Sequence, residues 1–131
     1  MTDHLLPGIQ AHDVSTPRLR ARVLERPAAS EAASTVLFVH GNVSSSLFYQ
    51  PTMRALAPDV RALAVDLRGF GESETLPVDA TRGLSDFADD VTSVLDALGV
   101  DAVHLVGWSM GGGVVMQLML AAPERILSVT L

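Results

Sequence analysis

Short apolar segments alternate with helix-forming segments along most of the chain, and this alternation limits the possible folds more than any other feature. The apolar segments are 35–40 (TVLFVH), 60–67 (VRALAVDL), 102–108 (AVHLVGW) and 126–131 (ILSVTL). Each is apolar throughout, as is typical of strands covered on both faces. The pattern predicts parallel β-α-β units with right-handed crossovers. The expected fold class is therefore α/β, with a mostly parallel central sheet and helices on both faces.

Helices are expected between these strands and a hairpin before them. The helical segments are 51–57, 84–100 and 110–122. In the second of these, apolar residues recur every three or four positions, with Ser85 as the expected N-cap and Gly99 as the expected C-cap. Residues 18–24 alternate polar and apolar side chains, which predicts an edge strand with 9–14 as its hairpin partner.

Three loops are expected to meet at one edge of this sheet. They contain His40-Gly41-Asn42, residues 66–71, and residues 107–112 (GWSMGG). In open parallel sheets, chemistry collects at the carboxyl ends of the strands. The functional site is therefore expected where these loops lie.

Ser109 has three possible roles in its glycine-rich loop. A dinucleotide-binding turn is disfavoured, because its fingerprint requires glycine at the position of Ser109. A second possibility is that the serine only caps the following helix. The third is a nucleophile elbow, Gly-x-Ser-x-Gly between a buried strand and a helix, with Gly107 and Gly111 leaving room for a tight turn. The amide of Met110 would then be free to bind an oxyanion.

The segments VHGN, DLRGFGES and GWSMGG together resemble the α/β-hydrolase family, in the family's order and at about its spacing, over residues 9–131. The resemblance implies a serine hydrolase that cleaves an ester or similar acyl bond of a small molecule. Ser109 would be its nucleophile, and the amides of Met110 and Asn42 would form the oxyanion hole. No cofactor is implied.

The other motif residues are interpreted as structural. His40 is expected to shape its loop without acting as the base, and Asp66 and Arg68 are expected to brace the loop after their strand. His104 is expected to be a satisfied core histidine, and Trp108 to form a pocket wall.

The catalytic acid and histidine are missing from the sequence after Ser109. In this fold they follow the serine in chain order, but Glu124 is the only acid there and no histidine occurs. We therefore expect residues 1–131 to be the N-terminal part of a single hydrolase domain, truncated after the strand at 126–131 and inactive by itself. The alternative is a catalytically inactive truncated hydrolase or a non-catalytic binding module.

Composition limits the possible partners. The net charge is −6 without a basic patch, which argues against nucleic acid or an anionic membrane. The chain has no cysteine, and its four histidines lack ligand spacing, so no metal site is expected. No apolar run is long enough to span a membrane, and no signal peptide is recognised, which favours a cytoplasmic protein. The apolar segment 126–131 predicts an open sheet edge that promotes self-association.

The loop HGNVSSSLF also resembles that of haloalkane dehalogenases, which share the fold. Those enzymes carry an aspartate nucleophile and displace a halide, whereas a serine attacks a carbonyl and requires an oxyanion hole. Ser109 therefore favours acyl chemistry, and epoxide hydrolases of the fold are disfavoured for the same reason. Carbon–carbon bond hydrolases and cofactor-free haloperoxidases keep the serine, so the sequence leaves esterase, carbon–carbon hydrolase and haloperoxidase open.

Overall fold

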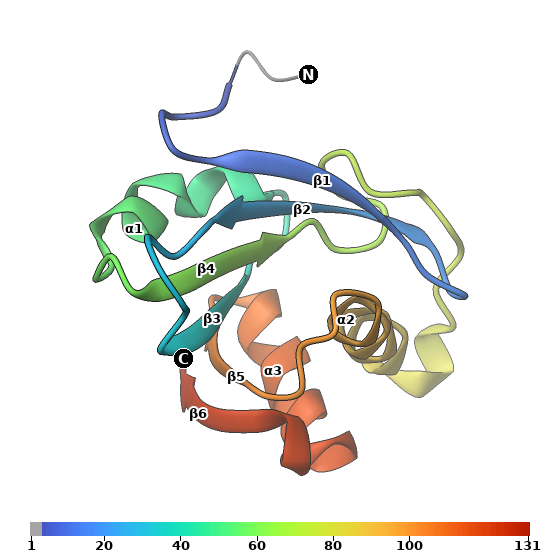
Figure 1. Ribbon diagram of the computed structural model, residues 1–131. Helices are drawn as coiled ribbons and strands as arrows, with labels where there is room; N and C mark the ends of the chain where they lie inside the picture. Colours follow the sequence, from blue (N-terminus) through green and yellow to red (C-terminus); the bar gives the residue numbers. More distant parts are fainter. Residues whose placement is uncertain (1–3) are drawn as a thin grey trace.

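A six-stranded sheet forms the centre of the computed structural model, which describes residues 4–131 (Figure 1). Its strands are β1 (Gln10–Ser15), β2 (Arg20–Arg26), β3 (Ser34–Val39), β4 (Val60–Val65), β5 (Val103–Gly107) and β6 (Ile126–Thr130). The α-helices are α1 (Gln50–Ala55), α2 (Ser85–Ala97) and α3 (Met110–Ala121). Short 3₁₀ turns are η1 (Ser46–Tyr49), η2 (Ala80–Arg82) and η3 (Pro123–Arg125).

The strands lie in the order β1-β2-β4-β3-β5-β6. The pairs β4–β3, β3–β5 and β5–β6 are parallel, and the hairpin β1–β2 joins β4 antiparallel. Leu37 of β3 lies opposite Leu63 of β4 and Leu105 of β5, so the centre of the sheet is a row of leucines. The predicted mostly parallel α/β sheet with an N-terminal hairpin is confirmed.

Each face of the sheet packs a hydrophobic core against helices. On one face, Leu37, Leu63 and Leu105 pack with apolar residues of α2 and α3, such as Val91 and Leu118. On the other face, a smaller cluster contains Ile9, Leu24, Phe38, Tyr49, Met53, Ala62 and Ala64. The smaller cluster includes η1 and α1 residues. Helices therefore cover both faces of the strands β3 and β4.

Coverage of that second face stops before β5 and β6, in contrast to the expectation of strands buried on both sides. Val106 of β5 is only partly buried against the smaller cluster. His104 is half-buried, and its Nδ1 lies 2.7 Å from Ser128 Oγ at the surface. The interpretation of His104 as a core histidine was wrong, because the α1 cluster packs on β2, β3 and β4 and contacts β5 only through the partly buried Val106.

The start of α2 also differs from the prediction. Leu84 occupies the N-cap position and Ser85 is the first helical residue, so no side chain caps the helix. Asp86 in the first turn instead accepts a hydrogen bond of 2.8 Å from the amide of Asp79. Gly99 has φ +68 just beyond the helix, as a C-terminal glycine should. Within residues 4–131, no helix has the length and apolar character needed to cross a membrane.

Candidate active site

Ser109 lies on a strained turn between β5 and α3. Its backbone has φ 55 and ψ −120, and it is one of two non-glycine residues with positive φ among those described. Its side chain is exposed and makes no capping hydrogen bond to the helix. A non-glycine residue in this region costs roughly 1–3 kcal/mol and persists only where the surroundings enforce it. The strain and the absent cap argue against the simple N-cap interpretation.

The glycines around Ser109 permit close contact between backbones. A Cβ added to Gly107 would lie 2.7 Å from the Gly111 carbonyl oxygen. A Cβ on Gly111 would lie 2.1 Å from the carbonyl oxygen of Val39 and 2.5 Å from that of His40. These distances are shorter than real Cβ atoms allow. The turn therefore requires glycine at both positions, as the elbow pattern predicts.

The loop after β3 lies directly beside the serine. A Cβ added to Gly41 would come within 3.1 Å of Ser109 Cβ and 2.8 Å of Trp108 Cε3. Asn42 follows Gly41 and is exposed, and Met110 begins α3. Among the hydrogen bonds found within residues 4–131, none is donated by the amides of these two residues. The two residues predicted as oxyanion donors thus adjoin Gly41 and Ser109 in the chain, and their role in an oxyanion hole stays a prediction.

His40 is a buried structural residue. Its Nε2 accepts a hydrogen bond of 3.0 Å from the Leu67 amide, and its Nδ1 lies 2.7 Å from the Gly41 carbonyl oxygen. This network requires the neutral tautomer with the proton on Nδ1. Burial holds the pKa of His40 below its usual value, although the Gly41 hydrogen bond and the Asp66 charge oppose that shift. Both ring nitrogens are occupied, so His40 does not serve as the base, as predicted.

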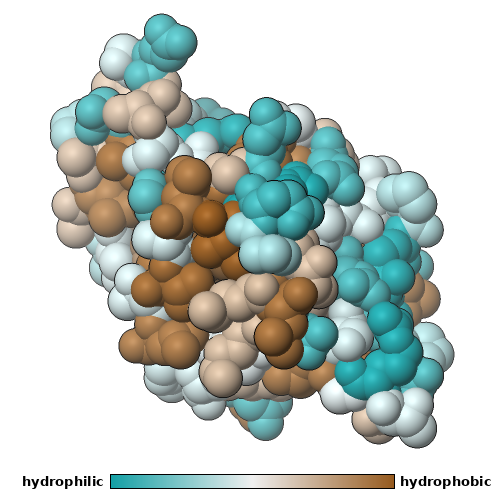
Figure 2. Space-filling model, turned by 90° about the horizontal axis from the view of Figure 1, so that it is seen from below, coloured by the Kyte–Doolittle hydropathy of each residue, from teal (hydrophilic) through white to brown (hydrophobic). Residues whose placement is uncertain are grey.

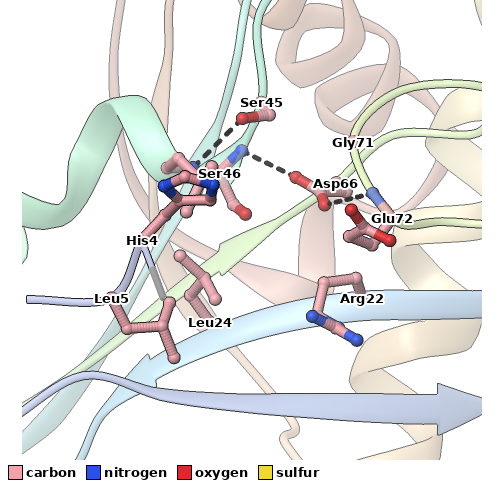
Figure 3. Close-up of a pocket in the computed structure, with 10 residues that line it drawn as sticks. His4, Leu5, Arg22, Leu24, Ser45, Ser46, Asp66, Gly71 and Glu72 are labelled. Atoms are coloured by element: carbon pink, nitrogen blue, oxygen red, sulfur yellow. Dashed lines mark hydrogen bonds between the residues drawn. The ribbon is translucent and has the colours of Figure 1, made fainter. Parts of the chain in front are cut away.

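Asp66 connects two loops (Figure 3). Its Oδ1 accepts from the Ser46 amide at 2.7 Å, and its Oδ2 accepts from the Glu72 amide at 2.9 Å. Gly71 lies so close that a Cβ there would be 2.1 Å from Asp66 Oδ2. The bracing role predicted for Asp66 is confirmed. The small pocket of Figure 3 lies among these loops, lined by His4, Arg22, Ser46 and Asp66 among others.

Arg68 braces the same loop from the other side. Its Nε and Nη2 donate to the two carboxylate oxygens of Asp90 on α2, each at 2.8 Å, and Nη1 donates to the Pro77 carbonyl at 2.6 Å. The hydrogen bond to Asp90 raises the pKa of Arg68. The sequence indicated that Arg68 is structural but gave no sign of Asp90, which is 22 residues away.

Phe48 lies beside the serine turn, which the sequence did not indicate. Its ring stacks on Trp108, with centroids 5.0 Å apart and planes at 11°. Both rings remain half-exposed beside Ser109. Trp108 is 48% exposed and therefore not a core residue, and its role as a pocket wall stays a prediction. No local pattern links Phe48 to it, because the contact joins η1 to the elbow across the sheet edge.

No acid or base contacts Ser109 in the part of the chain that the structure describes: none of its hydrogen bonds involves Ser109 Oγ. Glu124 is exposed in η3, beyond the far end of α3. The strained serine turn is therefore present within residues 4–131 without a proton acceptor for Ser109.

The chain belongs to the α/β-hydrolase fold family. The family model described as alpha/beta hydrolase fold matches residues 34–131. The chain is 42% identical, over 76% of its length, to the dihydrolipoyllysine-residue acetyltransferase component of an acetoin cleaving system from Cupriavidus necator, of which it covers 26%. It is 34% identical over 72% of its length to a carboxylesterase of Bacillus subtilis, covering 31% of it. A putative carbamate hydrolase of Variovorax paradoxus is 41% identical over 80% of the chain, which covers 38% of that relative.

Solved structures give the same result. A serine hydrolase from Cycloclasticus zankles superposes with a TM-score of 0.84 at 28% identity, over 93% of this chain and 44% of that one. An epoxide hydrolase from Vigna radiata gives 0.83 at 28% identity, over 95% of this chain and 38% of that one. The chain thus spans about a quarter to two fifths of the length of the curated relatives named above.

Proposed function

We propose that Ser109 is the nucleophile of an α/β-hydrolase that cleaves an ester or similar acyl bond of a small molecule. The observation that carries this proposal is the strained, exposed position of Ser109 at the start of α3, enforced by the glycine contacts of Gly107 and Gly111. Strain of this kind at a solvent-facing hydroxyl is a feature of functional sites. The carboxylesterase and the serine hydrolase among the similar proteins also support acyl chemistry.

In the proposed reaction, Ser109 Oγ attacks the carbonyl carbon of the substrate and loses its proton to a base. The carbonyl oxygen becomes an oxyanion, to which the amides of Asn42 and Met110 donate. Collapse of this intermediate breaks the bond to the leaving alcohol, which takes up the proton and departs. Water then attacks the acyl group on Ser109 by the same route, releasing the carboxylic acid and restoring the serine.

The base and the acid that orients it are proposed to lie in a part of the protein that corresponds to the remaining length of the relatives. Residues 1–131 would then be the N-terminal part of one hydrolase domain. Without a base, a serine hydroxyl is a weak nucleophile. The alternative, a chain that is inactive or only binds ligands, is favoured by one observation: within residues 4–131, Ser109 Oγ has no hydrogen-bond partner.

The test is covalent labelling of a version of the protein extended to the full length of its relatives. A fluorophosphonate should form one adduct at Ser109, found by peptide mass spectrometry, and the Ser109→Ala variant should remain unlabelled. The extended protein should cleave short acyl esters. Labelling at another serine, or no labelling in a protein shown to be folded, would contradict the proposal.

The epoxide hydrolase among the structural relatives raises a second question about bond type. Serine chemistry predicts no halide release from 1-chlorobutane by the same extended protein, since that displacement suits a carboxylate nucleophile. Release of halide while Ser109 stays unlabelled would assign the protein to alkyl displacement instead. Carbon–carbon cleavage and haloperoxidase activity are to be assayed alongside, because both keep the serine.

A further inference from the structure

We propose that Phe48 and Trp108 form an aromatic wall that selects substrates with a planar, apolar acyl group. This inference rests on the proposed function, because it places the wall beside the acyl group bonded to Ser109. The acyl group stays on or next to the serine through both steps of the reaction. The Trp108 ring and the Ser109 side chain both lie against Gly41, so this wall is next to that group in both steps.

The rings are available to a ligand. Phe48 is 58% exposed and Trp108 is 48% exposed, although each already contacts the other. Solvent exposure of large aromatic surface is unfavourable, and a flat ligand that covers it gains both apolar burial and ring contacts. The nearly parallel rings offer their free surfaces and edges as a shelf rather than as a closed core.

The shelf is held rigidly from both sides. The Trp108 amide donates to the Val39 carbonyl at 3.2 Å, and its ring lies against Gly41, where a Cβ would be only 2.8 Å from Cε3. Phe48 also contacts Tyr49 edge-on, with centroids 5.3 Å apart, and the Tyr49 hydroxyl donates to the same Val39 carbonyl at 3.1 Å. A rigid shelf loses little entropy when a ligand binds.

The segment that carries Phe48 brings no charged side chain to the shelf, although Arg22, Asp66 and Glu72 line a pocket together with its Leu47. Residues 41–50 (GNVSSSLFYQ) contain no acidic or basic side chain. Val43, 89% exposed, and Leu47, 40% exposed, lie on the same segment and add apolar surface. Nothing in this segment would pair with a charge on the acyl group, and the polar donors near Ser109 are the amides needed for the oxyanion. The acyl group that fits is therefore uncharged and flat.

The experiment measures binding rather than turnover, in the Ser109→Ala variant of the 131-residue chain. Trp108 is the only tryptophan, so its indole N–H gives a single ¹H–¹⁵N cross-peak that reports on this place. Methyl benzoate and methyl cyclohexanecarboxylate are similar in size, but only the first is planar. Titration with each gives a Kd from the movement of the Trp108 peak. The measured Kd values do not depend on whether Ser109 is a nucleophile. Conversely, covalent labelling of Ser109 would not show that the aromatic wall binds a planar group.

We expect methyl benzoate to bind about 3- to 10-fold more tightly than the cyclohexane ester, the range that aromatic contacts contribute. Adding Phe48→Leu should abolish that preference and leave the other cross-peaks in place. A folding defect would instead move cross-peaks throughout the spectrum. Adding Leu120→Ala, a change of an exposed apolar residue on α3, should leave the preference intact. Equal affinity for the two esters, a preference that survives Phe48→Leu, or a Trp108 peak that does not move would overturn the proposal.

Discussion

The two ends of helix α3 differ sharply in how the rest of the chain contacts them. At the N-terminal end, Gly111 and Gly112 are buried, and Gly111 touches the backbone of β3. Toward the C-terminal end, Met116, Met119 and Leu120 are exposed, with Leu120 at 80%. The serine turn is thus fully supported by residues of this chain, whereas the other end of the same helix presents an apolar surface without cover.

That apolar surface continues onto β6. Met116, Met119, Leu120 and Leu131 line one shallow depression, and Met119, Pro123, Ile126 and Val129 line another. In the view from below, hydrophobic residues gather across the middle and left of the molecule, and hydrophilic residues occupy the right (Figure 2). A contiguous apolar surface beside a free sheet edge is typical of an interaction surface. The strained serine turn is thus formed although this surface is uncovered within residues 4–131.

The largest expected effect on stability is at the N-terminal end of α3. Gly111→Ala would place its Cβ 2.1 Å from the Val39 carbonyl oxygen, and a backbone atom cannot move aside cheaply. The substitution should lower the free energy of unfolding by about 3 kcal/mol, the upper end of the usual cost of overpacking. Urea denaturation followed by circular dichroism measures this change.

Gly112→Ala is the matched control for that substitution. The nearest atom to its added Cβ is 3.6 Å away, an ordinary contact. Alanine is also the better helix former, so stability should stay the same or rise by about 0.5–1 kcal/mol. If Gly111→Ala and Gly112→Ala lost the same stability, the loss would come from the helix and not from the contact of Gly111 with β3.

The open end should drive self-association of the chain. We expect sedimentation velocity to show dimers or larger species that increase with concentration. Leu120→Lys puts a charge in the middle of the apolar surface and should shift the chain toward monomer at little cost in stability, because the residue is 80% exposed. Val78→Lys adds the same charge at another exposed apolar position and should leave the association unchanged. A monomeric wild-type chain at high concentration would contradict this expectation.

A smaller effect on stability should come from the protonation of the buried His40. Burial lowers its pKa from the usual 6.5, so below about pH 6.5 the unfolded chain binds a proton that the folded chain does not. The free energy of unfolding should therefore fall as the pH drops from about 6.5 toward the lowered native pKa, by at most about 1.4 kcal/mol per pH unit. Denaturation at pH 7.5 and 5.5 should show this loss, and His40→Gln should lack it. An unchanged pH dependence in His40→Gln would assign the effect to another group.

The last prediction is that Ser109→Ala has no effect on ester hydrolysis by the 131-residue chain. The 131-residue chain should hydrolyse a p-nitrophenyl ester no faster than its Ser109→Ala variant, because no base reaches Ser109 Oγ within residues 4–131. Loss of one triad member costs factors of about 10⁴ in known serine enzymes. Turnover that depends on Ser109 would show that the site at the N-terminal end of α3 already has a base. His40 or another group would then have to move to reach Ser109 Oγ.

Several features of the fold and site were accessible from the sequence because they depend on local patterns. Continuous apolar runs predicted the parallel strands, since both faces of a central strand meet a core. Gly-x-Ser-x-Gly between strand and helix predicted the elbow, because only glycine permits the backbone contacts now seen at Gly107 and Gly111. The family resemblance led to the prediction that Asp66 and Arg68 brace the loop after β4. The resemblance indicates which positions have this role, but not which residues they contact.

Only the tertiary structure decided which distant residues meet. The Arg68–Asp90 pair and the Phe48–Trp108 stack join segments that no periodicity connects. The bare face over β5 and β6, which leaves His104 near the surface, depends on how far the α1 cluster extends across the sheet. Local sequence sets backbone conformation and the direction of side chains, whereas the partner that a side chain finds depends on the packing of every element around it.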